Sequence, residues 1–343
     1  MPPSPQPTAE RSAADTAEPA RGTARFPEPR RADCPWCGSG NLRARLRAPD
    51  PRRRGPGGSV VDACGDCAHV FQNPRRATGM PAFPHDRLLA HPGLAARHRA
   101  AARALLPFTE PESWLDIGTG HGHFPAAART VHPYTSFDGL DPTRRVERAR
   151  AAGRVEEAHV GRPADPPIAE RLRARYDVVS MFHHLERAPE PREELRAALE
   201  LLRPGGHLLV ETTDPDCAFA ALLGTWWPAH GRPDHPHLVP LPSLLGELEA
   251  LGCVVVATDR REPHVPHDLS GALALALARV LPAPDAPSRP SAPAPLRRTA
   301  SRVLGRASVA LLAPAVALDR LLAPALRRTR FSNAYRVIAR KED

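Results

Sequence analysis

Apolar and polar residues follow two different rhythms along the chain from residue 113 onward. Short apolar runs rich in Val, Leu and aromatic residues, bounded by Gly, Pro or Asp, predict strands. These strands are expected at 113–117, 134–140, 154–160, 176–181, 207–213, 252–258 and 333–340. Apolar positions at helical spacing predict helices between them, at 124–131, 193–202 and 241–251. Strands that alternate with helices indicate an α/β protein with a doubly wound, mostly parallel sheet.

A helical insertion interrupts this alternation before the last strand, at residues 264–330. Residues 269–281 and 301–326 have apolar or amphipathic periodicity, and a linker rich in Pro, Ala and Ser separates them at 282–295. The insertion can cap a site, contact a membrane surface through 301–328, mediate dimerisation or pack against the sheet. The pattern does not decide among these roles and leaves the oligomeric state open. A further helical stretch at 86–106 is expected to cover the sheet near a ligand.

A glycine-rich motif follows the first strand, with the sequence Asp-Ile-Gly-Thr-Gly-His-Gly at 116–122. Glycines at a strand-to-helix turn allow positive φ and close approach of a ligand, and the helix N-terminus favours an anion. A dinucleotide fingerprint would need glycine at His123, and a phosphate loop would need a lysine, whereas the only lysine is Lys341. The motif therefore indicates a different ligand, or a tight turn that binds none.

Two Cys-x-x-Cys pairs precede the sheet, Cys34 with Cys37 and Cys64 with Cys67. Four thiolates at this spacing favour a closed, structural Zn²⁺ site over a redox pair. His69 is either a substitute ligand or a surface histidine. We therefore expect a zinc ribbon at 31–78, after a disordered tail at 1–30 that is rich in Pro, Ala, Glu and Arg.

These motifs together resemble those of the class I S-adenosylmethionine (SAM)-dependent methyltransferases. The shared blocks are Asp-x-Gly-x-Gly-x-Gly at 116–122, Gly-Leu-Asp-Pro-Thr at 139–143 and Asp-Val-Val at 177–179, continuing to Leu-Arg-Pro-Gly-Gly at 202–206. A zinc ribbon that ends in Val-Phe-Gln-Asn-Pro-Arg, here at 70–75, is similar to that of the ubiquinone-biosynthesis-like group. The resemblance implies a seven-stranded Rossmann-like sheet of order 3-2-1-4-5-7-6 in a methyltransferase domain at 84–343.

The resemblance also implies how SAM is bound. The glycine loop would hold the methionine part, and Asp141, at the end of the second strand, would accept hydrogen bonds from the ribose. Asp138 should lie within that strand and face away, while Asp141 can also cap a helix before Pro142. Asp165 is a displaced candidate for the acid that meets adenine. The expected cofactor-binding residues are Asp116, Gly118, Thr119, Gly120, Gly122, Asp141, Pro142, Asp165 and Phe182.

Methyl transfer from a sulfonium is an in-line displacement for which a protein supplies proximity, orientation and exclusion of water. A base is needed when the acceptor is a hydroxyl or a protonated amine. His183 and His184 follow the fourth strand, where such a base would act, and His183 is preferred because the family often has histidine there. Either histidine can instead bond only to backbone. Arg187 stands where the family commonly has histidine.

We therefore expect SAM-dependent methylation of oxygen, nitrogen or carbon on a small-molecule acceptor. An RNA methyltransferase is an alternative because some such enzymes also carry a zinc ribbon, but no aromatic and basic stacking platform is evident. A non-catalytic module that binds SAM or zinc is the second alternative. His235 and His237 could bind a metal, although a loop that covers substrate is the commoner use of such a region.

Composition changes this picture only slightly. The net charge of +9 is carried almost wholly by arginine, and 42 prolines accompany it, as a GC-rich genome would produce. The basic charge is therefore weak evidence for nucleic acid, which we do not expect as a partner. The N-terminus shows no apolar signal region, and no apolar stretch is long enough to cross a bilayer. We expect a soluble, cytoplasmic protein.

Overall fold

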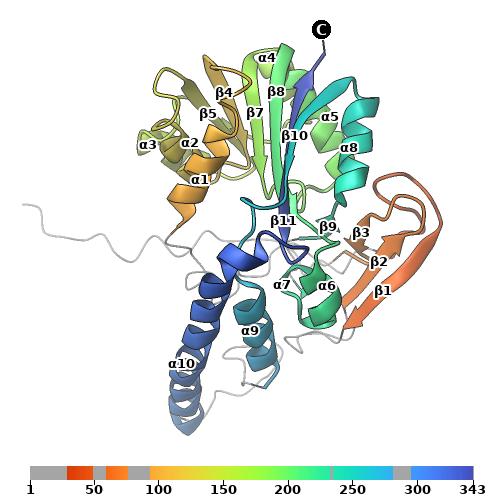
Figure 1. Ribbon diagram of the computed structural model, residues 1–343, viewed down its shortest axis with the longest axis vertical. Helices are drawn as coiled ribbons and strands as arrows, with labels where there is room; N and C mark the ends of the chain where they lie inside the picture. The colour runs from red at the N-terminus through yellow and green to blue at the C-terminus, as the bar shows by residue number, and fades with distance from the viewer. Residues whose placement is uncertain (1–28, 49–58, 76–92, 232–234, 281–294, 343) are drawn as a thin grey trace, which may run out of the picture.

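The computed structural model describes residues 29–48, 59–75, 93–231, 235–280 and 295–342. Its larger sheet has seven strands in the order β10-β11-β8-β7-β4-β5-β6 (Figure 1). The strands are β4 (Ser113–Ile117), β5 (Ser136–Asp141), β6 (Ala158–Val160), β7 (Tyr176–Phe182), β8 (Leu202–Thr213), β10 (Cys253–Asp259) and β11 (Ala334–Lys341). Pairs among β6, β5, β4, β7 and β8 are parallel, and β11 runs antiparallel to both β8 and β10. The predicted fold class and strand order are confirmed.

Helices cover both faces of this sheet because successive strand residues point to opposite sides. Trp114 and Val178 point into an apolar cluster with α1 (Leu94–Arg103) and α2 (His123–Ala128). Their neighbours Leu115 and Val179 point into the opposite cluster, where α4 (Pro166–Leu172), α5 (Pro191–Leu201) and α8 (Leu241–Ala250) pack. Helix α3 (Arg145–Ala151) follows β5. Strands buried on both faces explain the continuous apolar runs in the sequence.

Several boundaries differ from the predicted ones. The strand expected at 154–160 forms only at Ala158–Val160. Strand β8 was expected at 207–213 but begins at Leu202, so it includes the Pro-Gly-Gly segment. A register shift between β7 and β8 accommodates that segment, with Gly205 at φ 73°. The predicted tail at 1–30 and linker at 282–295 fall almost wholly outside the described residues, as does the start of the helix expected at 86–106.

A second sheet of four strands stands beside the first, in the order β1-β2-β3-β9. Strands β1 (Leu42–Ala48), β2 (Ser59–Cys64) and β3 (Val70–Gln72) come from the N-terminal part of the chain, whereas β9 (His237–Leu238) comes from far downstream. Phe71 pairs with His237 and Val70 with Leu238. The N-terminal sheet is thus completed by a strand that follows β8 in the chain.

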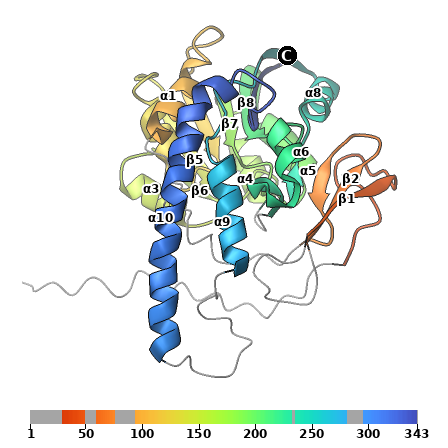
Figure 2. The same cartoon turned by 60° about the horizontal axis from the view of Figure 1, so that its bottom comes forward.

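The remaining helices lie at the carboxyl edge of the parallel strands. They are α6 (Ala218–Leu223), a short 3-10 helix (Gly224–Trp226), α7 (Pro228–Gly231), α9 (Asp268–Val280) and α10 (Pro295–Leu326). Helices α9 and α10 project side by side from that edge in both views (Figures 1 and 2). Among the described residues, no helix has the length and apolar character needed to cross a membrane.

Candidate SAM site and four-cysteine cluster

The glycine loop between β4 and α2 has three left-handed residues, Gly118 (φ 75°), Gly120 (φ 56°) and Gly122 (φ 69°). Gly122 caps α2, and the Gly118 amide donates to Leu140 O of β5 at 2.8 Å. A Cβ atom on Gly118 would lie 2.5 Å from His184 Nδ1. The loop therefore needs glycine both for its backbone conformation and for the space beside His184.

Asp141 ties the end of β5 to the glycine loop. Its Oδ2 accepts a hydrogen bond from the Gly120 amide at 2.9 Å, and its Oδ1 accepts from the amide and hydroxyl of Thr143 at 2.8 and 2.6 Å. Helix α3 begins at Arg145, so the expectation that Asp141 caps a helix with Pro142 as its first residue is wrong. A carboxylate has about four acceptor positions, so Asp141 can hold the loop and still accept from a ligand.

Asp138 faces the other side of β5, as the alternation of the strand predicted. Its carboxylate accepts from the Tyr176 hydroxyl and from the Glu157 amide, both at 2.9 Å. These contacts lie within the packed face of the sheet, away from the glycine loop. The two acids on β5 therefore contact different parts of the structure, Asp141 the glycine loop and Asp138 the packed face of the sheet.

Asp116 is the buried acid at the end of β4. Its Oδ1 accepts from the Ser180 hydroxyl at 2.8 Å, and burial raises the pKa of its carboxyl to about 7. Thr119 is also buried, with its methyl group over Gly139. A cationic ligand group next to this buried carboxyl would stabilise the charged form of the carboxyl.

Asp165 lies after β6 at the same sheet edge. Its Oδ2 accepts from the Arg162 amide at 2.7 Å, which closes the turn before α4. The Gly161 amide of this turn donates to Asp141 O at 3.0 Å. The loop that carries Asp165 is thus fixed beside Asp141.

His183 and Glu186 form a pair after β7. His183 has φ 50°, an uncommon backbone conformation for a non-glycine residue, and its Nδ1 lies 2.9 Å from Glu186 Oε1. Glu186 also accepts from the amide and hydroxyl of Thr213 at 2.8 and 2.9 Å. Burial alone would raise the pKa of the Glu186 carboxyl, but the charge and hydrogen bond of His183 hold it well below its usual value. Glu186 is therefore an ionised orienting group for His183.

His184 has a different environment. Its Nε2 lies 2.7 Å from Glu194 Oε1 of α5, and its ring is buried against Gly118. Phe182, just before the two histidines, packs against Phe124 with the rings tilted and their centroids 4.2 Å apart. The structure thus places Phe182 and His183 at the edge beside the loop and places His184 beneath the loop.

The comparisons with known proteins agree with this geometry. Residues 90–258 match a family model described as a methyltransferase domain. This segment is a class I SAM-dependent methyltransferase domain. The chain is 32% identical over 100 residues to the ubiquinone biosynthesis O-methyltransferase of Cronobacter sakazakii, covering 29% of this chain and 41% of that protein. The Serratia proteamaculans protein of the same name is 26% identical over 159 residues, which cover 44% of this chain and 63% of that protein.

The chain thus spans less than two thirds of the length of these relatives. Among solved structures, a methyltransferase described as a putative sarcosine dimethylglycine methyltransferase from Galdieria sulphuraria is 15% identical. The alignment covers 72% of this chain and 86% of that chain, with a TM-score of 0.44.

Two residues of this methyltransferase that lie near the site were missed by the sequence analysis, and both are on α1. The His98 ring lies 5.7 Å from that of Phe124 and 6.0 Å from that of Phe182, and burial lowers its pKa to about 4. Arg97 donates to Glu211 Oε1 of β8 at 3.1 Å. An Ala- and Arg-rich helix has no local catalytic signal, and only the packing of α1 on the sheet brings these side chains to the site.

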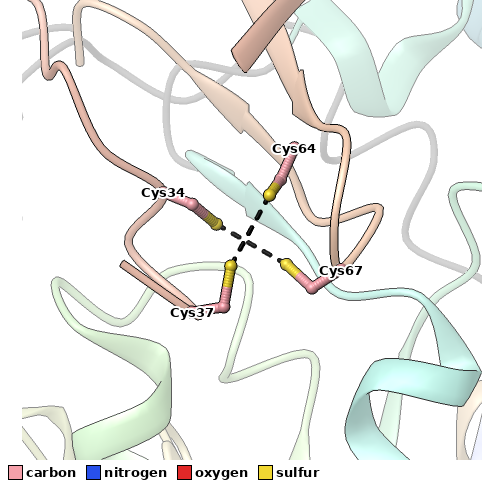
Figure 3. Close-up of side chains that lie close together, drawn as sticks. All are labelled: Cys34, Cys37, Cys64 and Cys67. Atoms are coloured by element: carbon pink, nitrogen blue, oxygen red, sulfur yellow. Dashed lines mark hydrogen bonds between the residues drawn. The ribbon is translucent and has the colours of Figure 1, made fainter. Parts of the chain in front are cut away.

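The four predicted cysteines converge at one point (Figure 3). The sulfur atoms of Cys34 and Cys67 are 3.6 Å apart, and those of Cys37 and Cys64 are 3.5 Å apart. Tetrahedral Zn²⁺ with Zn–S bonds of about 2.3 Å would hold its sulfurs ~3.8 Å apart. The donor set and its spacing therefore fit zinc.

Three histidines near this cluster differ from expectation. His69 is fully buried rather than on the surface, stacked between Trp36 and Phe71, with its Nε2 3.2 Å from His237 Nδ1. Among the described residues, neither His69, His235 nor His237 joins a group of candidate metal ligands. His237 is instead buried in β9, so it belongs to the junction between the two sheets.

Proposed function

We propose that the chain transfers a methyl group from SAM to a small-molecule acceptor held beside Phe182 and His183. The observation that carries this proposal concerns the Nε2 atom of His183. It is buried without a hydrogen-bond partner among the described residues, while Nδ1 is engaged by Glu186. A buried nitrogen next to the cofactor edge needs a partner, and an acceptor substrate would supply it.

The cofactor would lie along the carboxyl ends of β4, β5, β6 and β7. Backbone amides of the loop with Gly118, Thr119, Gly120 and Gly122 would meet the methionine carboxylate, and Asp116 would meet its ammonium group. Asp141 and Pro142 would border the ribose, and the Asp165 loop the adenine. Phe182 would pack beside the methyl group. Each residue is fixed locally, so SAM would enter a largely preorganised site.

His183 would act as the general base. When Nδ1–H donates a hydrogen bond to the Glu186 carboxylate and keeps its proton, Nε2 carries a lone pair that can accept a proton from an acceptor hydroxyl. SAM supplies a methyl group on a positively charged sulfur, which the acceptor displaces in line. His184, held by Glu194, would position the glycine loop without touching the acceptor.

We favour an oxygen atom of the small molecule as the acceptor of the methyl group. The matched relatives are named O-methyltransferases, and a hydroxyl is the acceptor that requires a base such as His183. Production of S-adenosylhomocysteine should be measured over a panel of hydroxylated, amino and RNA acceptors. Turnover with a hydroxylated small molecule supports the proposal, and turnover with RNA alone overturns it.

We further propose that residues 31–78 form a zinc ribbon ahead of a methyltransferase domain at 84–343. Zinc would act structurally, since four thiolates leave no open coordination position. Through β9, the ribbon would also support the catalytic segment, because the His237 amide donates to Glu186 O at 3.2 Å.

Replacing Cys64 with serine should remove the bound zinc, because three thiolates bind the ion much less tightly. Mass spectrometry of the wild-type protein should show one ion per chain, and the variant should show less than about a tenth of that. The buried Cys217 lies outside the cluster, so Cys217→Ser is the matched control and should keep its zinc. Full zinc content in the Cys64 variant would contradict the site.

Asp116→Asn should have opposite effects on stability and on SAM affinity. Burial raises the pKa of the folded-state carboxyl from 3.8 to about 7, so the stability that the protonated acid provides at low pH is lost as the pH rises through 7. The neutral amide should therefore stabilise the free protein at pH 8, on the order of 1–3 kcal/mol, and have little effect at pH 4.

SAM affinity of the same variant should fall about tenfold or more, because the charge that meets the ammonium group is gone. Thermal unfolding at both pH values and calorimetric titration with SAM measure the two effects. A variant that is less stable at pH 8, or one that binds SAM as well as the wild type, would show that Asp116 has another role.

A further inference from the structure

Helix α10 has one side packed and one side open. Leu312 and Asp319 are buried on its inner side, and Asp319 accepts hydrogen bonds from the Leu269 and Ser270 amides at 3.1 and 2.9 Å, which caps α9. After α10 the chain enters β11, where Ala334 pairs with Thr213. The helix pair is therefore fixed to the sheet edge that carries the site, and the rest of α10 extends away from it (Figures 1 and 2).

The open side of α10 carries a stripe of leucines. Leu311, Leu318, Leu321 and Leu322 are 57%, 46%, 78% and 38% exposed. At about 100° per residue these positions fall on one side of the helix, next to the packed side and distinct from it. Large apolar side chains gathered on one helix face mark an interaction surface.

The surroundings of this leucine stripe are strongly basic. Residues 295–330 contain eight arginines and a single acid, Asp319. That acid is buried against α9, whereas Arg320, Arg327, Arg328 and Arg330 are exposed. The surface of this part of α10 therefore has apolar side chains and positive charge, and residues 295–330 supply no second carboxylate to compensate it.

We propose that α10 docks on the surface of an anionic lipid bilayer, with the leucine stripe in the interfacial region and the arginines at the headgroups. Basic amphipathic helices bind such surfaces by burial of the apolar face together with attraction between their positive charges and the anionic headgroups. A second copy of the chain would bring the same arginines toward each other across a two-fold interface. Nucleic acid would neutralise the arginines but leave the leucines exposed. An anionic bilayer accommodates both features.

Vesicle co-sedimentation of the full chain tests this docking. Vesicles of phosphatidylcholine and phosphatidylglycerol in equal amounts should bind the protein at least about tenfold more tightly than vesicles of phosphatidylcholine alone, and 0.5 M salt should weaken the binding. The double variant Leu318→Ser and Leu321→Ser should lose about tenfold or more. Leu222→Ser is the matched control, since Leu222 is a leucine on α6 with 70% exposure.

A second variant keeps the test decisive if the leucine variant fails to fold. Replacing Arg327 and Arg328 with glutamine changes only exposed side chains, so thermal unfolding should match the wild type while binding to anionic vesicles falls. The proposal is overturned if the wild type does not bind anionic vesicles, or if Leu222→Ser loses as much binding as the stripe variant. It is also overturned if the wild type is a dimer that the stripe substitutions dissociate, while neither protein binds vesicles. None of these readouts requires methyl transfer.

Discussion

Replacing Asp141 with alanine should lower the affinity of the protein for SAM by about 100-fold or more. The carboxylate accepts hydrogen bonds from Gly120 and Thr143 and would accept two more from the ribose, and charged hydrogen bonds each contribute about 1.5–3 kcal/mol. Loss of the ribose contacts alone accounts for ~3 kcal/mol, which corresponds to about 100-fold in the dissociation constant. Release of the glycine loop adds to this loss.

Calorimetric titration with SAM measures the effect, and Asp138→Asn is the matched control. Asp138 lies three residues earlier on the same strand, but its carboxylate bonds to Tyr176 and Glu157. Its variant should lose some thermal stability and keep its SAM affinity within about threefold. Equal losses in the two variants would indicate damage to β5 rather than loss of a ribose contact.

Replacing His183 with alanine should lower turnover of a hydroxyl acceptor by about 10²- to 10⁴-fold, the range that general-base catalysis provides. SAM affinity should remain near the wild-type value because the proposed contact of the ring is with the acceptor and not with SAM. Glu186→Gln should lower turnover in the same way, since the amide does not stabilise the imidazolium and can favour the tautomer that carries its proton on Nε2.

Comparing turnover with SAM affinity separates this role from a purely structural one. The His183 variant should lose turnover while its SAM affinity and its thermal unfolding match those of the wild type, whereas a structural role would change all three. His207→Ala is the control, since His207 lies in the middle of β8, where it stacks on Phe108 and pairs with Val178, four residues before the end of β7, and it should keep full turnover. Unchanged turnover in the His183 variant would remove the base from the mechanism.

The strands of the sheet could be predicted because the sequence signals that identify them are local. Apolar runs at Trp114–Ile117 and Val178–Met181 identify buried parallel strands, and the Gly118–Gly122 spacing marks the turn that follows the first of them. Once the family resemblance fixes the strand order, the carboxyl ends of these strands must share one edge. The convergence of the glycine loop, Asp141 and His183 follows from that order.

The remaining features depend on contacts between distant segments. A two-residue strand such as β9 has no periodicity to detect, so neither its pairing with β3 nor the burial of His69 beside His237 was predictable from local pattern. The same holds for His98, whose environment depends on how α1 packs against Phe124 and Phe182. Long-range packing, rather than propensity, determines these parts of the site.

Titration of the zinc-loaded protein with S-adenosylhomocysteine is the most direct test of the SAM site. We expect one ligand bound per chain, with the heat of binding lost in Asp141→Ala and retained in Asp138→Asn. A folded wild-type protein that gives no binding heat and no thermal shift with this ligand would contradict the assignment of the glycine loop and Asp141 to SAM.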